Sequence, residues 1–477
     1  MRLRLECRLK IHQNETSYLN LLLIMSTPTA SIHGEWSTRL AFILAATGSA
    51  VGLGNIWKFP YMAGENGGGA FVIIYLGFII LFGLPVMMAE VLMGRRGRQS
   101  PINSLKLLCQ QEQANPFWAL IGWSGVLAGV LILSYYSVIA GWSLSYVLES
   151  GAGQLKNIDQ QEASNLFKQL ISDPLKLVVW HSIFMFMTIM VVARGVNGGI
   201  EVAVRYLMPA LFLLLLILIG YSLAHGGFAQ AVEFLFTPDF SKINQDVVLS
   251  AMGQAFFSLS LGMGAIMIYG SYLKKTASIG KTTLAVAIAD SSVAILAGLA
   301  IFPIVFSNGL ETAQGAGLIF NTLPLAFGQM SGGLFFGTLF FILLVFAAWT
   351  SSISLIEPAV AWLVENRGLA RVRASIYCGF ATWLIGLGTV LSFNYGQNWQ
   401  LFGKTFFDCL DYLTSNIMLP LGGLMIALFV GWVMKESSVR DELAMQNSMI
   451  YSIWRLLLRF VTPLGLVLVF LSVIEVI

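Results

Sequence analysis

Three residues that carry oxygen ligands share one face of a long apolar segment. Ala347, Thr350 and Ser351 stand at i, i+3 and i+4, so a helix would bring a backbone carbonyl and two hydroxyls together. Carbonyl and hydroxyl oxygens suit a hard cation such as sodium. For this triplet by itself, hydroxyls that bond back to carbonyls of their own helix are the more ordinary interpretation. A cation site therefore needs further oxygen atoms from another part of the chain.

An acidic residue, Asp290, lies inside a second apolar segment at 281–307. A carboxylate at membrane depth is costly to bury, so an acid in such a segment is functional by default. The alternative is a carboxylate that faces a water-filled vestibule on the inner side. Asp290 is therefore a candidate functional residue.

Two further apolar segments carry glycine where a straight membrane helix would not. They are 48–55 (GSAVGLGN) and 258–264 (SLSLGMG). Glycine lowers the cost of leaving helical geometry, and unwound backbone at membrane depth is tolerated only where it lines a cavity. One such segment alone is more ordinarily a small-residue packing surface. Because the two lie five helices apart and carry polar Asn55, Ser258 and Ser260, together they indicate a transport site on an inverted repeat.

The composition places these segments in a membrane. Apolar residues make up 57% of the 477 and charged residues 11%, against roughly 25% charged in a soluble domain. A crossing needs about 20 apolar residues. Apolar stretches of suitable length occur at 39–62, 68–93, 118–149, 176–193, 200–224, 247–273, 281–307, 333–365, 370–391, 402–433 and 454–475.

The sequence thus predicts an all-α polytopic membrane protein with about eleven transmembrane helices and a single transporter domain at 35–477. Helices 1 to 5 (about 39–224) and helices 6 to 10 (about 247–433) would form the 5+5 inverted repeat, with the first and sixth broken. Helix 11 (about 454–475) follows the repeat.

The basic residues predict the orientation. Most of the 27 Lys and Arg fall in segments that are cytoplasmic if the N-terminus is, as the positive-inside rule requires. With eleven crossings in the plasma membrane, the C-terminus lies outside. Residues 1–34 are then a cytoplasmic tail, because the apolar run 19–25 is too short to span and lacks a small-residue cleavage site. Alternatively, translation begins at Met25.

Other classes of chemistry find no support in the sequence. The four cysteines form no CxxC pair and the four histidines are scattered, so no structural metal site or disulfide is expected. HExxH, GxSxG and phosphate-loop motifs are absent, which argues against an enzyme. The sequence implies no nucleic-acid partner, but it does imply contact with the lipid bilayer.

Five stretches are long and specific enough to suggest a family. They are WSTRL (36–40), GSAVGLGNIWKFP (48–60), ENGGGAF (65–71), QAFFSLSLG (254–262) and TSS (350–352). The chain resembles the neurotransmitter:sodium symporter family, in its bacterial amino-acid transporter branch with eleven helices, from about residue 34 to the end. The resemblance implies sodium as the coupling ion and transport by alternating access.

The resemblance implies one sodium site that uses the triplet described above. Ala347, Thr350 and Ser351 would be joined there by the carbonyls of Gly48 and Val51. These carbonyls belong to the first glycine-rich break, so they would supply the oxygen atoms that the triplet lacks.

A second sodium site is implied beside the substrate. Its ligands would be the Ala50 carbonyl, the Asn55 amide, the Ser258 backbone and hydroxyl, and the carboxylate of the substrate. Contact between ion and substrate couples their affinities reciprocally. Asp290 matches a neighbourhood that holds an Asn sodium ligand in the family, where chloride-independent members carry an acid in place of chloride. It would serve either role, and transport without chloride is expected.

The substrate site implied by the resemblance lies between the two breaks. Amides of a broken helix and the Tyr136 hydroxyl would hold a carboxylate, carbonyls of both breaks and the Ser260 hydroxyl would hold an ammonium, and apolar residues would line the side-chain pocket. Each apolar residue taken singly is ordinary packing, and adaptable Met263 favours a large aliphatic or aromatic substrate. The expected residues are Ala50, Leu53, Gly54, Ile132, Tyr136, Phe257, Ser258, Ser260, Met263, Ser351 and Leu355.

Two charged pairs match the gates of the family, each with a departure. Lys58 and Asp411 would form the outer pair, where Lys58 replaces an Arg and loses its bidentate fork. Glu365 would form the inner gate with His33, which also replaces an Arg. Protonation of His33 would then make the inner gate depend on pH near neutrality, whereas the alternative is a His33 that is a bystander on the tail.

The sequence as a whole predicts a sodium-coupled symporter that imports a neutral, hydrophobic or aromatic amino acid without chloride. A different small organic solute is the main alternative. A channel would need repeated filter segments that frame a pore, and a sensor would ordinarily carry an added soluble domain. Neither is found in the sequence, so both are weaker interpretations.

Overall fold

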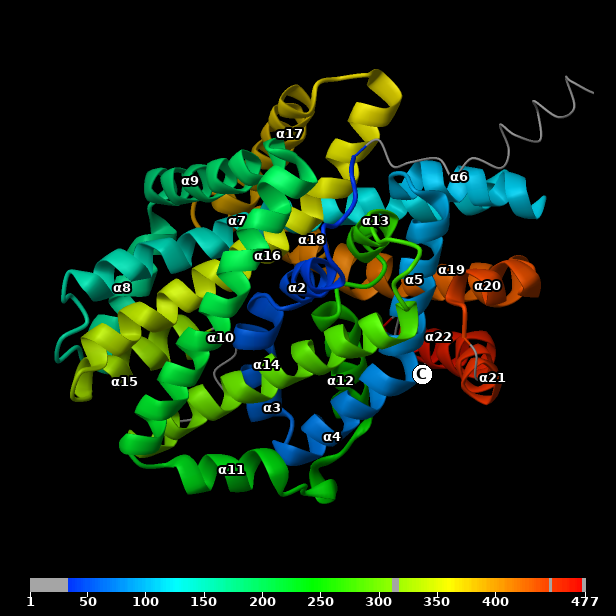
Figure 1. Ribbon diagram of the computed structural model, residues 1–477. Helices are drawn as coiled ribbons and strands as arrows, with labels where there is room; N and C mark the ends of the chain where they lie inside the picture. Colours follow the sequence, from blue (N-terminus) through cyan, green and yellow to red (C-terminus); the bar gives the residue numbers. More distant parts are fainter. Residues whose placement is uncertain (1–32, 311–316, 446–447, 474–477) are drawn as a thin grey trace, which may run out of the picture.

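A computed structural model describes residues 33–310, 317–445 and 448–473, and these residues are almost entirely helical (Figure 1). Their only extended pairings are two isolated bridges, Gly68 with Pro238 and Leu401 with Lys404. The predicted tail at 1–34 lies outside the described residues except for His33 and Gly34, and so does the alternative start at Met25.

Nine continuous helices of the described residues are long and apolar enough to cross a membrane. They are Gly69–Gly97 (α4, η2, α5), Pro116–Gly151 (η3, α7), Pro174–Ala193 (α9), Val196–Ala224 (η4, α10), Ile279–Ser307 (α14), Gly333–Arg367 (α16), Arg371–Ser392 (α17), Phe406–Val433 (α18, η7, α19, η8) and Ser448–Leu468 (α21, η9, α22).

Two further crossings are interrupted. Helix α2 (Arg39–Ala50) is followed by η1 (Gly54–Lys58) and α3 (Phe59–Glu65), and the two parts meet at 53°. Helix α12 (Gln245–Ser258) is separated from α13 (Ala265–Ser271) by non-helical residues 259–264. The predicted all-α membrane fold, with breaks in the first and sixth predicted helices, is confirmed, and nine continuous helices and the first broken pair among the described residues are long and apolar enough to span.

The second break has a local cause in its glycines. Gly262 has φ = 81°, a left-handed conformation that other residues adopt only with strain. A Cβ at this position would also lie 2.6 Å from the carbonyl oxygen of Leu419. Glycine therefore meets two needs here, a turn out of the helix and a close approach to α19 (Leu419–Leu428).

Helix α16 brings the predicted oxygen triplet to the centre of the molecule. It packs against α2, α7 and α10, and its middle third is buried. Ala347, Thr350 and Ser351 thus lie beside the break that follows α2.

Several short helices lie between the crossings, and the sequence did not predict them. Helices α6 (Pro101–Glu112) and α20 (Glu436–Leu443) lie on the right of Figure 1. Helix α8 (Gln160–Ser172) and α15 (Leu323–Gln329), which follows η6 (Leu318–Thr322), lie on the left. The remaining two are α11 (Phe228–Phe236) and η5 (Phe240–Lys242).

Candidate functional site

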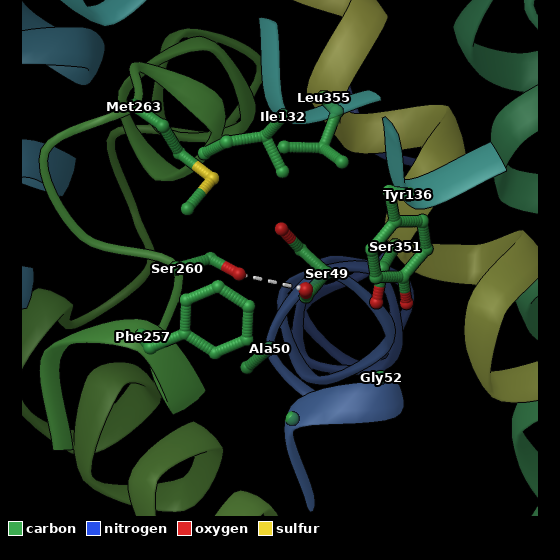
Figure 2. A pocket seen from close by; sticks show the side chains of 11 residues that line it. Ser49, Ala50, Gly52, Ile132, Tyr136, Phe257, Ser260, Met263, Ser351 and Leu355 are labelled. Atoms are coloured by element: carbon green, nitrogen blue, oxygen red, sulfur yellow. Dashed lines mark hydrogen bonds between the residues drawn. The ribbon is translucent and has the colours of Figure 1, made fainter. Parts of the chain in front are cut away.

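A small cavity lies between the two helix breaks (Figure 2). Every residue predicted for the substrate site lines it except Leu53 and Ser258, and the sequence missed Ser49 and Gly52. The lining residues are Ser49, Ala50, Gly52, Gly54, Ile132, Tyr136, Phe257, Ser260, Met263, Ser351 and Leu355.

The cavity has an apolar wall and a polar wall. Figure 2 shows Ile132, Met263 and Leu355 gathered on one side, with the ring of Phe257 opposite. The hydroxyls of Tyr136 and Ser351 lie together on another side. No charged side chain is among the lining residues, so the cavity suits a neutral ligand with an apolar part.

The first break presents backbone groups to the polar wall. The Leu53 N–H donates to the Tyr136 hydroxyl at 3.2 Å, and the Ser260 hydroxyl donates to the Ser49 carbonyl at 2.8 Å. Ser260 itself has φ = 54°, so its hydroxyl reaches α2 from a strained turn of the second break. The Ser260 bond joins the two breaks, and the Tyr136 bond joins the first break to α7, so that Gly54 at the start of η1 lines the cavity.

A buried polar cluster joins four helices next to the cavity. The Asn55 amide donates to Asp290 Oδ1 at 2.8 Å and to Ser258 Oγ at 3.1 Å. Ser258 Oγ donates to Asp290 Oδ2 at 2.6 Å. Asn55 and Asp290 are fully buried, and three of the residues predicted for this site, Asn55, Ser258 and Asp290, lie together.

Tyr75 on α4 is a member of this cluster that sequence reasoning missed. Its hydroxyl lies 3.1 Å from Ser258 Oγ and donates to Asp290 Oδ2 at 3.4 Å. No motif marks Tyr75, because its role depends on how α4 packs against α12. The Asp290 carboxylate therefore accepts bonds from three neutral side chains.

The two hydroxyls of the oxygen triplet on α16 behave differently: one bonds within its own helix, and the other bonds to the first break. Thr350 Oγ1 donates to carbonyls of its own helix, at 3.1 Å to Phe346 and 3.0 Å to Ala347. Ser351 Oγ instead crosses to the first break and lies 3.2 Å from the Gly48 carbonyl and 3.1 Å from the Val51 carbonyl. The five oxygen-bearing residues expected for this site are thus adjacent.

Comparisons with known proteins agree with this geometry. The model of the "Sodium:neurotransmitter symporter family" matches residues 33–165 and 164–477. This chain belongs to that family. The symporter is 40% identical over 449 residues to the sodium-dependent transporter YhdH of Bacillus subtilis, which covers 93% of this chain and 98% of the relative. It is 34% identical over 444 residues to a sodium-dependent transporter of Haemophilus influenzae, and the match covers 92% of this chain and 97% of that relative.

A solved structure shares the fold. The crystal structure of MhsT in complex with L-phenylalanine superposes with a TM-score of 0.86 at 43% identity, covering 92% of the symporter and 99% of MhsT. The family resemblance, the multi-pass membrane fold and the absence of an enzymatic role are thereby confirmed, and sodium dependence follows from the family.

The predicted inner gate of the symporter is closed by several bonds to Glu365. His33 Nε2 lies 2.9 Å from Glu365 Oε1, and both side chains are buried. The Ser100 N–H and the Asn103 amide donate to the same carboxylate at 2.7 Å each, and the Ser100 hydroxyl also donates to it. Trp36, which follows His33, is buried and donates to the Tyr269 carbonyl at 3.0 Å.

The predicted outer pair is separated in this structure. The Lys58 ammonium lies over the Phe257 ring, 4.6 Å from its centroid, while Asp411 accepts a bond from Ser415 at 2.9 Å. Lys58 and Asp411 form no ion pair in the described part of the chain. A second, larger cavity of about 340 Å³, lined by Lys58, Phe257 and others, adjoins the first at Phe257. The site is therefore closed on the His33 side, and on the Lys58 side it adjoins the second cavity.

Substitution of Glu365 by Gln is expected to weaken closure on the His33 side. The amide loses the charge that accepts four donors, and bonds to a charged group contribute about 1.5–3 kcal/mol each. If fewer molecules are closed on the His33 side, the apparent affinity falls for any ligand that binds only to that closed form. We expect the sodium concentration for half-maximal substrate binding to rise about tenfold, measured by sodium titration of radioligand binding to the purified symporter.

Glu35→Gln is the matched control on the same side. Glu35 pairs with Arg98 at 2.8 Å, and the two side chains are 40% and 10% exposed. Glu35→Gln removes a charge on the same side without touching the bonds to Glu365, so its sodium titration should shift less than that of Glu365→Gln. Equal shifts in the two variants would contradict a special role for Glu365.

Proposed function

We propose that the symporter imports a neutral, hydrophobic or aromatic amino acid across the plasma membrane by alternating access, driven by sodium and without chloride. The observation that carries the proposal is the cavity itself. One wall is apolar, the other is built from hydroxyls and helix-break backbone, and no charged side chain lines it. A zwitterion with an apolar side chain complements both walls.

The substrate would lie with its charged groups at the breaks. The amides of Leu53 and Gly54 and the Tyr136 hydroxyl would hold the carboxylate, since the N-terminal end of a helix favours anions. The carbonyls of Ala50 and Phe257, and Ser258 and Ser260, would meet the ammonium. The phenylalanine bound to MhsT supports a side chain of about that size against Ile132, Phe257, Met263 and Leu355.

Sodium would occupy the two oxygen-rich sets described above. The bonds from Ser351 Oγ to Gly48 and Val51 support one set, with Ala347 and Thr350 as its other members. The cluster of Asn55, Ser258 and Asp290 supports the second, with the Ala50 carbonyl and the substrate carboxylate as further ligands. The buried carboxylate of Asp290 would supply a negative charge beside the bound ion, which is the basis for transport without chloride.

The orientation in the plasma membrane is part of the proposal. The N-terminus would be cytoplasmic and the C-terminus outside, so that His33 and Glu365 form the inner gate and Lys58 and Asp411 the outer one. In this assignment the structure is an outward-facing form, and closure on a substrate would bring Lys58 and Asp411 together.

Ser351→Ala is expected to weaken sodium coupling. The hydroxyl is one ligand of the proposed ion site, and its loss leaves the Gly48 and Val51 carbonyls without a bridging group. One lost polar contact of this kind corresponds to about a tenfold rise in the sodium concentration for half-maximal uptake. Ser375→Ala is the control, because the Ser375 hydroxyl donates to the Arg371 carbonyl of its own helix. A sodium dependence unchanged in Ser351→Ala would remove this serine from the site.

Uptake into proteoliposomes tests the function as a whole. Radiolabelled Trp, Phe, Leu and Ala would be supplied with sodium or potassium outside, and with chloride or gluconate as the anion. We expect sodium-dependent accumulation of a large apolar amino acid that is indifferent to chloride. Uptake indifferent to sodium would refute the coupling. Sodium-dependent uptake of a betaine or methylamine, with none of the four amino acids, would favour the alternative solute class.

A further inference from the structure

A cluster of arginines surrounds one tyrosine where α20 meets α21 (Ser448–Leu456). The Arg440 guanidinium lies 4.0 Å from the centroid of the Tyr451 ring, and its Nε donates to Glu436 at 2.8 Å. Arg455 donates to the Tyr451 hydroxyl at 2.5 Å and lies 3.2 Å from the second oxygen of Glu436. Figure 1 shows α20 and α21 beside each other, away from the cavity of Figure 2.

A third arginine extends this group along the last crossing. Arg459, in η9 (Leu457–Val461), lies over the Trp432 ring at 4.9 Å from its centroid. Its Nε donates to the Gly431 carbonyl at 2.5 Å, and Trp432 Nε1 donates back to the Arg459 carbonyl at 3.1 Å. These bonds fix the guanidinium between η9 and η8 (Phe429–Val433). Arg440, Arg455, Arg459 and Glu436 are called the arginine cluster below.

The arginine cluster carries an excess of positive charge. It has three guanidinium groups against one carboxylate, a net charge of +2. The hydrogen bond from Arg440, with the charges of Arg455 and Arg459, holds the pKa of Glu436 below its usual range. Glu436 is therefore ionised at neutral pH, and it still leaves two positive charges without a partner in the cluster.

An exposed apolar stripe runs beside the cluster. Met449, Ile453, Leu456, Phe460 and Leu464 are all exposed large hydrophobic residues. Their spacing of three or four residues places them on one face of a helix, in a crossing that has to face lipid. Arg455 and Arg459 each precede a member of the stripe by one residue. Positive charge and lipid-facing surface are thus adjacent.

We propose that the arginine cluster binds the headgroup of an anionic phospholipid. Such a lipid matches both features, because its phosphate meets the guanidinium groups while its acyl chains cover the apolar stripe. Trp432 is 52% exposed beside Arg459, and tryptophan is the side chain that favours the headgroup level of a bilayer. Arginine binds phosphate in a bidentate way. A basic group between helices near the headgroups is a known type of lipid site.

The test measures lipid binding to the full-length purified protein. The wild-type chain in detergent is titrated with phosphatidylglycerol or phosphatidylcholine, and bound lipid is counted by native mass spectrometry. Phosphatidylglycerol should bind more tightly than phosphatidylcholine. Because one Lys or Arg near a lipid surface contributes about a fivefold factor in affinity, the double variant R455Q/R459Q should bind phosphatidylglycerol about 25-fold more weakly.

Two control variants separate this site from general effects. R194Q/R367Q removes two exposed arginines elsewhere and makes the same change in net charge, so its phosphatidylglycerol affinity should stay near wild type. R455K/R459K keeps the charge and should retain most of the binding even if the glutamine variant folds poorly.

Three results would overturn the proposal. One is equal affinity for the two lipids, and another is an equal loss in R455Q/R459Q and R194Q/R367Q. The third is full competition by soluble glycerol phosphate at the concentration of the lipid, since this would identify a free phosphate site that makes no use of the apolar stripe.

Discussion

Replacement of Asp290 by asparagine is expected to raise the sodium concentration for half-maximal uptake by more than about tenfold, the largest effect expected of any single side chain in the proposed ion sites. The change removes one negative charge and keeps the shape of the side chain. Sodium-dependent uptake in proteoliposomes measures the result. Phenylalanine or the best substrate found in the uptake assay serves as the reporter.

The physical reason is the absence of a cation near a buried carboxylate. Asp290 is fully buried, and its hydrogen-bond donors Asn55, Tyr75 and Ser258 are all neutral. Among the described residues no lysine, arginine or histidine pairs with it. An unpaired buried charge is costly, and a bound sodium ion relieves that cost. The carboxylate and the ion therefore stabilise each other.

Chloride distinguishes the two roles open to Asp290. If the carboxylate is a direct sodium ligand, the sodium affinity of Asp290→Asn stays low in chloride and in gluconate alike. If it replaces a bound anion, chloride restores uptake in the variant. Asp246→Asn is the control, since Asp246 is an exposed acid on α12. An Asp290→Asn variant with wild-type sodium dependence in both anions would remove Asp290 from the coupling mechanism.

The sequence predicted the crossings well because a bilayer imposes a simple length and composition. Each predicted apolar segment overlaps a helix or a broken pair, with ends shifted by a few residues. The two breaks were also predictable, since Gly52 and Gly262 stand in runs of small residues that a lipid-facing helix does not need. Nine of the eleven predicted substrate residues line one cavity, because the family resemblance placed them on helices that pack together.

The short helices between the crossings left no comparable signal. Helices α6, α8 and α20 are mixed in polarity and too short to span, so nothing in the apolar pattern marks them. Tertiary packing decided other details. Thr350 and Ser351 share one face of α16, but only the approach of the first break makes Ser351 bond across to Gly48 while Thr350 bonds within its helix.

Gly52 lies between the proposed ion site and the proposed substrate site. A Cβ at this position would lie 2.6 Å from Ser351 Oγ and 2.8 Å from the Tyr136 hydroxyl. Ser351 Oγ bonds the break carbonyls of the proposed ion site, and the Tyr136 hydroxyl accepts from Leu53 N–H at the substrate end. One methyl group would therefore disturb both.

Gly52→Ala is consequently expected to lower sodium and substrate affinity together, each by about 10-fold or more, because overpacking of a dense site costs about 1–3 kcal/mol. Gly52 does not have a positive φ, so alanine fits its backbone and the effect is steric. Gly77→Ala is the matched control, since a Cβ there meets nothing within 4 Å. Substrate and sodium titrations of both variants, with melting curves to confirm folding, give the comparison. A loss of substrate affinity alone would show that Ser351 keeps its contacts with the break carbonyls, and would separate the ion site from the substrate clamp at this residue.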